Sequence, residues 1–366
     1  MIAVAVLALP IVMVRKFDHS TAGLLVPAAY VLALLSLQGF VTFGLSTVLF
    51  GDFVRYMALG ALFALAASRS VTTREITRFY VISCLPAALI SVAGGLASAP
   101  WATNATGRVA GTFSHSNAAG AYFAVAALAG LGLWIVTRSR SAALVALLNL
   151  FGLLITQSLG GVIGLAGGVG AIVLFNARAS ATTRWITLLL SGLIALAGLT
   201  RTSVFGRIAE FRSVSIDYSL NTAAASDSFT WRIVNWVQLV DIWRESPIWG
   251  HGLGTTSYIQ PLGTFAHSMP IEILVETGVV GLALATAILV SGLRMGVSLS
   301  KALHPLGPLT VGLLVFVVLN GSESNLLRYT AADFLLAALL GLAMGARRFQ
   351  RDGAATLLST SSTERT

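Results

Sequence analysis

The sequence has few charged residues and a single cysteine. Asp, Glu, Lys and Arg make up 10% of its 366 residues, while hydrophobic residues make up 56% and the mean hydropathy is +0.85. Soluble globular domains carry about a quarter charged residues, so this composition excludes an ordinary soluble fold and predicts a polytopic membrane protein. The one cysteine, Cys84, lies in an apolar run, and this excludes a disulfide framework and a CxxC metal site.

Long apolar runs dominate the chain instead. They fall at about 1–14, 21–45, 53–67, 76–97, 117–137, 141–157, 160–176, 185–200, 269–293, 305–320 and 330–346. A segment inside a bilayer must satisfy its own backbone hydrogen bonds, so these runs predict an all-α fold with about 11 transmembrane helices. We interpret the run 1–14 as a short helix rather than a signal peptide, because no basic residue precedes it.

The basic residues indicate which side of the membrane each loop faces. If the long polar loop at 201–268 lies outside, 15 of the 23 Lys and Arg residues fall in the inside loops, in agreement with the positive-inside rule. This placement explains the net charge of +9 better than a nucleic-acid partner does. We expect a multi-pass protein of the cytoplasmic (inner) membrane. Residues 1–351 are predicted to form one membrane domain, and residues 352–366 a disordered cytoplasmic tail.

The extracytoplasmic loop 201–268 contains an amphipathic segment at 229–245. Polar residues recur on one side of it at Arg232, Asn235, Gln238 and Asp241, and apolar and aromatic residues fill the other side. Tryptophans on such a helix favour the headgroup region. We therefore predict a helix that lies on the outer membrane surface with Arg232 facing polar material.

His267 directly follows this loop and precedes the next apolar run. Ser268 can cap that helix, Pro270 suits its first turn, and Glu272 lies where the helix dipole favours an acid. A neutral imidazole held at the mouth of a helix can accept a proton from a hydroxyl. The alternative is an interfacial histidine with a structural hydrogen bond.

Four motifs around the loop resemble those of the O-antigen ligase and polymerase family. They are Arg108-x-x-Gly111-Thr112-Phe113-Ser114-His115-Ser116-Asn117, Arg232-x-x-x-Trp236, Pro247-Ile248-Trp249-Gly250-His251-Gly252-Leu253-Gly254, and His267-Ser268-x-x-Ile271-x-x-Leu274-x-Glu276-x-Gly278-x-x-Gly281. The resemblance covers roughly residues 100–345.

The resemblance implies an enzyme that transfers a glycan from undecaprenyl pyrophosphate to an acceptor hydroxyl, without a cofactor or metal. His267 would be the base and Arg232 a pyrophosphate contact, since the guanidinium fork matches phosphate oxygens. Further substrate-binding candidates are the loop cations Arg201, Arg207 and Arg212 and the motif residues Arg108, Asn117 and Glu276. The expected partners are the lipid-linked glycan, a glycan or lipid acceptor, and membrane lipids.

The chain departs from the family pattern at three positions. Leu159 stands where the family often has an Arg that contacts phosphate, Ser268 replaces an Asn, and Ser116 replaces a Pro. The loss at Leu159 leaves an inactive structural homologue as one alternative, unless a loop arginine replaces it. Ligase and polymerase share these residues, so the sequence leaves both open.

Two further alternatives to a glycan transferase are a solute transporter and a zinc protein. A transporter of a small solute should show discontinuous helices and ionisable groups near the middle of the membrane, whereas most charges here lie at helix ends, with Glu276 and Asp333 as exceptions. A zinc site built from His115, His251 and His267 is not supported by any HExxH or His-x-His spacing.

Overall fold

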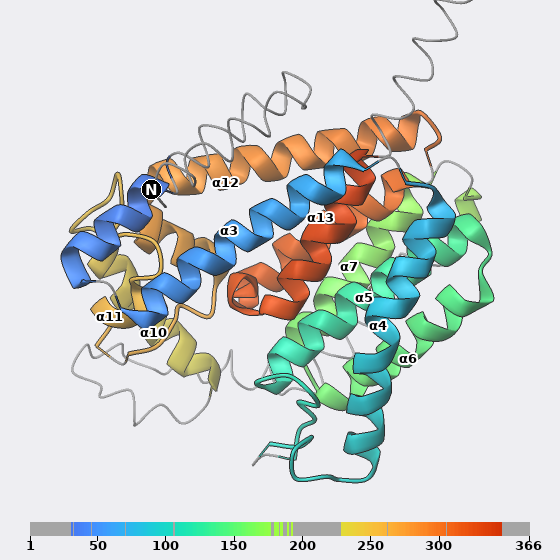
Figure 1. The fold of residues 1–366 in the computed structure, drawn as a ribbon, viewed down its shortest axis with the longest axis horizontal. Helices are drawn as coiled ribbons and strands as arrows, with labels where there is room; N and C mark the ends of the chain where they lie inside the picture. Colours follow the sequence, from blue (N-terminus) through green and yellow to red (C-terminus); the bar gives the residue numbers. More distant parts are fainter. Residues whose placement is uncertain are drawn as a thin grey trace, which may run out of the picture. The chain divides into compact units, whose positions relative to one another are not determined.

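The computed structural model describes residues 31–345, except 32, 45, 70, 105–106, 177–178, 183, 186–188, 190–191, 193–227, 262 and 305. Within these residues the protein is helical, and one isolated β-bridge joins Thr103 to Val109. The helices labelled in Figure 1 are α3 (Thr47–Ser68), α4 (Thr73–Leu96), α5 (Ser116–Thr137), α6 (Arg140–Thr156), α7 (Leu159–Phe175), α10 (Ser228–Trp243), α11 (Thr256–Ile259), α12 (Met269–Lys301) and α13 (Leu306–Glu323). A 3₁₀ turn, η2 (Leu326–Arg328), follows α13. The predicted all-α class is confirmed.

Five described helices, α3, α4, α5, α12 and α13, are long and apolar enough to cross a membrane. Four shorter apolar helices span Ala33–Phe43, α6, α7 and Thr330–Gly345. Large side chains such as Ile82 and Leu144 are 73% and 67% exposed on these helices, as expected for surfaces that meet lipid rather than water. The chain is therefore a multi-pass membrane protein.

The predicted apolar runs within the described residues coincide with helices, but some ends differ. α12 continues to Lys301, eight residues beyond the predicted end at 293, because a helix can carry Arg294 and Lys301 out of the apolar region on long side chains. α3 begins at Thr47 rather than at 53. The run 1–14, most of 185–200 and the tail 352–366 lie outside the described residues, so the count of 11 helices stays a prediction.

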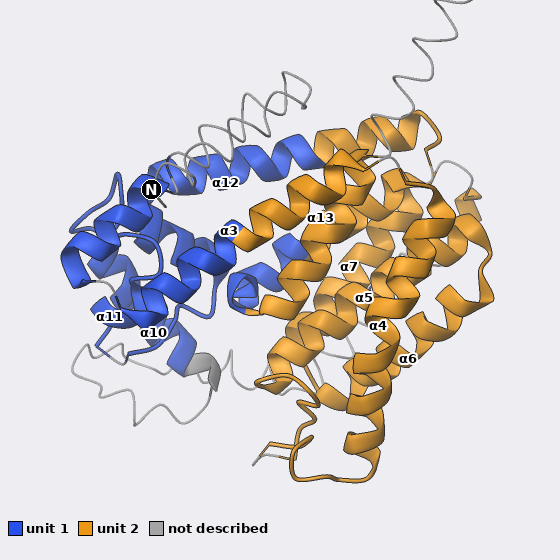
Figure 2. Ribbon diagram, viewed as in Figure 1, with its two compact units in different colours: residues 1–57, 189–292, 317–328 blue, residues 58–188, 293–316, 329–366 orange. Residues whose placement is uncertain are grey.

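The chain divides into two compact units, coloured separately in Figure 2. The second unit comprises residues 58–188, 293–316 and 329–366. Helices approach closely there at glycines: a Cβ at Gly168 would lie 3.0 Å from the Gly312 carbonyl oxygen, and one at Gly161 would lie 3.0 Å from that of Gly120. Small residues thus let α7 pack on α13 and α5, as in other membrane bundles.

The first unit comprises residues 1–57, 189–292 and 317–328. Its small core consists of Leu239, Ala266 and Val275, with Ile242, Trp243, Ile259 and Ile271 packed around it. This core joins three segments: the helix α10, the loop that ends at residue 268, and the start of α12. It therefore places the predicted arginine helix directly against the predicted histidine motif.

α12 is interrupted at Gly278, whose φ of 64° and ψ of −168° are not helical. The turn 247–252 supplies hydrogen bonds at the break. His251 N and Gly252 N donate to the carbonyls of Val275 and Glu276 at 3.0 and 2.9 Å, and Val279 N donates to the Pro247 carbonyl at 2.9 Å.

The approach of the two backbones explains a pair of motif glycines. A Cβ at Gly278 would lie 2.1 Å from the Ile248 carbonyl oxygen, and one at Gly250 would lie 2.5 Å from the Glu276 carbonyl carbon. Both glycines also have positive φ, at 64° and 70°, a region that other residues rarely adopt. The glycine-rich motif is thus the partner of the broken helix.

Candidate functional site

The segment before His267 is held by side chains of α10. Asn235 Nδ2 donates to the Phe265 carbonyl at 3.0 Å, and Trp236 Nε1 donates to the Ala266 carbonyl at 2.6 Å. Asn235 is fully buried, and its oxygen accepts from Gln260 Nε2 at 2.7 Å. The predicted polar stripe of this helix is therefore not a uniformly solvated face, because Asn235 points inward to satisfy the loop.

His267 adopts a left-handed backbone conformation, with φ of 51°. Such a conformation is uncommon for a residue other than glycine and persists only where the surroundings fix it. The imidazole meets the ring of Trp231 edge to face, with centroids 5.3 Å apart. Trp231 precedes Arg232 on α10, so the predicted base and the predicted phosphate contact lie on segments that touch each other.

Arg232 is ion-paired in this structure. Its Nη1 donates to the carboxylate of Glu323 and, at 3.2 Å, to the Glu323 backbone carbonyl. The Arg232 side chain is 15% exposed and that of Glu323 is 32% exposed. Glu323 is the last residue of α13 and also accepts from Ser324 Oγ at 2.8 Å. A ligand phosphate would therefore compete with Glu323 for Nη1 of Arg232.

Glu272 and Glu276 face a buried arginine in the first unit. Arg328 Nε and Nη2 donate to Glu272 Oε1 at 3.0 and 2.9 Å, and Nη2 donates to Glu276 Oε1 at 3.1 Å. Arg328 Nη1 donates to Asp52. The guanidinium also lies over the Phe265 ring, 3.9 Å from its centroid. We call Arg328, Asp52, Glu272 and Glu276 the carboxylate cluster.

The carboxylate cluster is almost sealed from solvent. Glu272 is 1% exposed and Glu276 is 2% exposed. Burial by itself lowers the pKa of Arg328, but Glu276, Tyr56, Glu272 and Asp52 raise it more, so the net pKa of the guanidinium is raised and the charge is fixed. Glu276 also accepts from Thr256 Oγ1 at 2.9 Å, so the predicted substrate-binding Glu276 serves as an internal acceptor here.

Arg108 and Asn117 come together within the second unit. Arg108 Nη2 donates to Asn117 Oδ1 at 2.9 Å, and Arg108 Nε donates to the carbonyl of Thr156, the last residue of α6, at 3.0 Å. Nη2 also reaches the Gln157 carbonyl at 3.3 Å. A cation at the end of a helix satisfies its last carbonyls and its dipole.

Leu159, where the related motif often has an arginine, is the first residue of α7. The Arg108 guanidinium contacts Gln157, so a positive charge is present at the turn between α6 and α7 although Leu159 supplies none. Ser158 caps α7 by accepting from Gly161 N. The loop arginines Arg201, Arg207 and Arg212, one of which was expected to replace the missing arginine, lie outside the described residues.

Sequence reasoning missed Arg328, Asp52 and Glu323 as parts of the site. A signal for the first two was available, because ionisable residues in apolar helices are costly and need a partner. Asp52 and Glu276 both lie in such helices, and Arg328 follows α13. Glu323 is the last residue of α13, and an acid at a helix end gives no indication in the sequence that it needs a partner.

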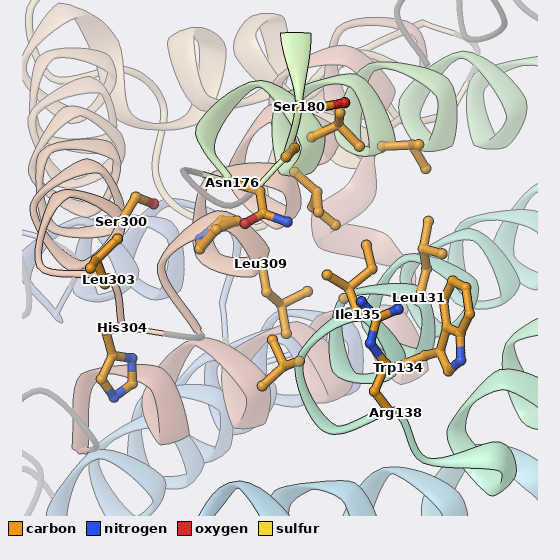
Figure 3. A pocket seen from close by; sticks show the side chains of 17 residues that line it. Leu131, Trp134, Ile135, Arg138, Asn176, Ser180, Ser300, Leu303, His304 and Leu309 are labelled. Atoms are coloured by element: carbon orange, nitrogen blue, oxygen red, sulfur yellow. The ribbon is translucent and has the colours of Figure 1, made fainter. Parts of the chain in front are cut away.

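Within the described residues, no group of three or more His, Cys, Asp and Glu side chains could hold a metal ion. The second unit contains a cavity of about 730 Å³ with mostly apolar walls. Figure 3 shows Arg138 beside Trp134 at one edge and His304 and Leu303 at another. The lining includes none of the predicted site residues.

The apolar helices define a multi-pass membrane protein, and His267 together with Arg232 forms its candidate site. Residues 142–286 match the family model described as O-antigen ligase, which confirms the resemblance to that family and supports glycan transfer of this general kind. The match includes α10, the glycine-rich turn and His267, whereas Arg108, Glu323 and Arg328 lie outside it. No curated protein matches the chain.

Proposed function

We propose that the protein transfers a glycan from undecaprenyl pyrophosphate to an acceptor hydroxyl at the outer face of the cytoplasmic membrane. The observation that carries the proposal is the contact between the two functional segments: Trp231, next to Arg232, packs on His267, and α10 holds the two carbonyls before His267. Residues 142–286, which match the family model, include both segments.

In the proposed reaction the acceptor oxygen attacks the anomeric carbon of the donor glycan. The hydroxyl proton passes to His267, a new glycosidic bond forms, and the bond from the anomeric carbon to the pyrophosphate oxygen breaks. Undecaprenyl pyrophosphate leaves with the bonding electrons. Arg232 binds the developing negative charge on the leaving group, where a guanidinium can form two parallel hydrogen bonds.

The decisive experiment is His267→Ala in cells or membranes that contain the donor and acceptor. A general base contributes about 10²–10⁴-fold, so transfer should fall by that factor while the amount of inserted protein stays unchanged. His304→Asn is the matched control, because it replaces a histidine of the α12–α13 turn. Normal transfer by a stably inserted His267→Ala would remove the base from the proposal.

A solute transporter is the second candidate, and two observations bear on it. α12 is discontinuous at Gly278, and Asp52, Glu272 and Glu276 are buried in α3 and α12, as transport sites require. Arg328 already pairs these carboxylates, and the turn 247–252 bonds with the backbone at the break. Because these carboxylates and the backbone groups at the break already have partners within the protein, a structural role is favoured over a solute-binding one. Solute uptake by the wild type that is lost in Asp52→Asn, together with no glycan transfer by either protein, would favour the transporter.

A further inference from the structure

Arg328 stands outside the motifs that resemble the family, yet its side chain forms several ion pairs. Its side chain is 9% exposed, and its guanidinium forms ion pairs with Asp52, Glu272 and Glu276. Arg328 ends the 3₁₀ turn Leu326–Arg328, just after α13. Five donors in a flat fork suit this task, since one guanidinium can reach several carboxylates at once.

Two contacts connect this arginine to the residues that precede His267. Glu272 uses one carboxylate oxygen for Arg328 and the other for Ala266 N, which donates at 2.8 Å. A flat face of the guanidinium lies over the ring of Phe265. Arg328 therefore contacts Phe265, two residues before the histidine, directly, and Ala266, one residue before it, through Glu272.

The same two residues are held from their other side by α10, through the bonds from Asn235 and Trp236 to their carbonyls. The peptide groups before His267 are thus fixed on the donor side by Glu272 and on the acceptor side by α10. This double hold accounts for the left-handed conformation at His267, which would otherwise relax toward a commoner one.

We propose that Arg328 is a positioning residue, which sets the place of the His267 imidazole by holding the Glu272 carboxylate in the position where it accepts from Ala266 N. The effect on glycan transfer rests on the proposed function, but the effect on the His267 segment does not. Without Arg328, Glu272 and Glu276 are buried carboxylates without their shared counter-ion. A buried carboxylate that loses its partner rearranges or draws in water, and Glu272 then no longer holds the Ala266 N–H in place.

The charge of Arg328 is not sufficient for this role. A lysine ammonium has no fork to bridge three carboxylates and no flat surface to lie on Phe265. Arg328→Lys keeps the net charge of the carboxylate cluster and should still release Ala266. The matched control is Arg55→Lys, since Arg55 pairs with the other oxygen of Asp52 at 3.3 Å and has no recorded contact with residues 265–267.

The test uses the full chain, purified in detergent, and measures two properties of the segment without any glycan. Amide hydrogen exchange at Ala266 should be faster in Arg328→Lys by about 10- to 100-fold, the effect of losing one hydrogen bond to a charged group. Carbethoxylation of His267 by diethyl pyrocarbonate, followed by mass spectrometry, should be faster too. Arg55→Lys should leave both rates close to wild type.

Phe265→Leu provides a second variant in case Arg328→Lys does not fold, because it removes the ring beneath the guanidinium without changing any charge. It should shift the same two rates in the same direction. Wild-type exchange at Ala266 and wild-type reactivity of His267 in a folded Arg328→Lys or Phe265→Leu protein would overturn the inference.

A transfer assay separates this inference from the proposed function. If both hold, Arg328→Lys lowers kcat by about 10²-fold, as a misplacement of about 1 Å can, with little change in KM for the donor. If His267→Ala transfers glycan normally, the proposed role of His267 as the base fails, while the exchange and labelling results still decide the role of Arg328.

Discussion

Arg232 and Glu323 form an ion pair that joins the middle of the proposed transfer site to the end of α13. The arginine is mostly buried and donates to both the carboxylate and the backbone carbonyl of the same residue. An anionic donor must therefore compete with Glu323 for the guanidinium. Glu323 in this way sets how strongly Arg232 can attract a diphosphate.

Removal of that competitor should strengthen donor binding. Glu323→Gln keeps the size of the side chain and removes its charge. Partly exposed ion pairs are worth about 0.2–1 kcal/mol, so the apparent KM for the lipid-linked donor should fall by up to roughly fivefold. Donor titration in reconstituted membranes measures this. Asp241→Asn is the control, because it removes the carboxylate of the exposed Arg244–Asp241 pair; a raised KM in Glu323→Gln alone would contradict the competition.

The fork of Arg232 should matter as much as its charge. Hydrogen bonds to charged groups contribute about 1.5–3 kcal/mol, so Arg232→Ala should lose roughly 10- to 100-fold or more in kcat/KM. Arg232→Lys keeps the charge without the bidentate geometry and should be strongly impaired as well. Arg244→Lys, on the exposed end of the same segment, should transfer normally. Donor binding by Arg232→Ala at wild-type strength would refute the phosphate contact.

The contact between the glycine-rich turn and α12 should be intolerant of side chains. Gly278→Ala would place a methyl group against the Ile248 carbonyl and force a positive φ on alanine. Strained backbone of this kind costs about 1–3 kcal/mol, so the melting temperature in detergent should fall. Gly51→Ala is the control, since a Cβ there meets nothing within 4 Å and alanine favours helix. Equal melting temperatures for the two variants would show that the break tolerates a side chain.

Acidification should weaken the start of α13. His304 Nδ1 accepts the Leu306 N–H at 3.2 Å, which requires a neutral ring. Burial lowers the pKa of His304 in the folded protein, so its contribution to stability is full above the unfolded pKa of about 6.5 and is lost as pH falls below it. The loss should be about 1 kcal/mol, comparable to the loss of a helix cap.

His304→Asn tests this dependence, because asparagine keeps an acceptor oxygen and does not titrate in this range. Melting temperatures of the wild type and the variant should diverge between about pH 7 and pH 5, with the wild type falling further, by about 2–4 °C. Parallel curves for the two proteins would exclude His304 as the source of acid sensitivity.

Transfer should not depend on a divalent cation, because side-chain cations can stabilise the departing diphosphate. Membranes treated with EDTA should retain full transfer in the proposed reaction. Loss of transfer that Mg²⁺ or Mn²⁺ restores would require a metal in the mechanism.

Local patterns in the sequence predicted the helices well. The apolar run 117–137 corresponds to α5, Ser116–Thr137, and the predicted amphipathic segment 229–245 corresponds to α10, Ser228–Trp243. Both signals depend on neighbours within one helix, which the sequence displays directly. The inward position of Asn235 was not predictable in the same way, because its partners Phe265 and Gln260 come from a loop 25 to 30 residues away.

Long-range pairing limited the prediction of the site. The motifs identified His267 and Arg232, but nothing local links Arg328 to Asp52, which are 276 residues apart in the chain. The acidic helix start at Glu272 suggested a dipole effect, whereas the structure pairs it with Arg328 and Ala266 N. The glycines at 250 and 278 could be recognised as a motif, but their mutual contact required the fold.

The carboxylate cluster imposes an order on biosynthesis. A ribosome makes the chain from its N-terminus, so the turn 247–252 exists before the interrupted helix that it must meet. Arg328, by contrast, is synthesised 56 residues after Glu272 and 52 after Glu276. Both glutamates therefore enter the membrane before their counter-ion has been made. The ion pairs of the cluster can form only at the last stage of assembly, when α13 and the turn after it arrive.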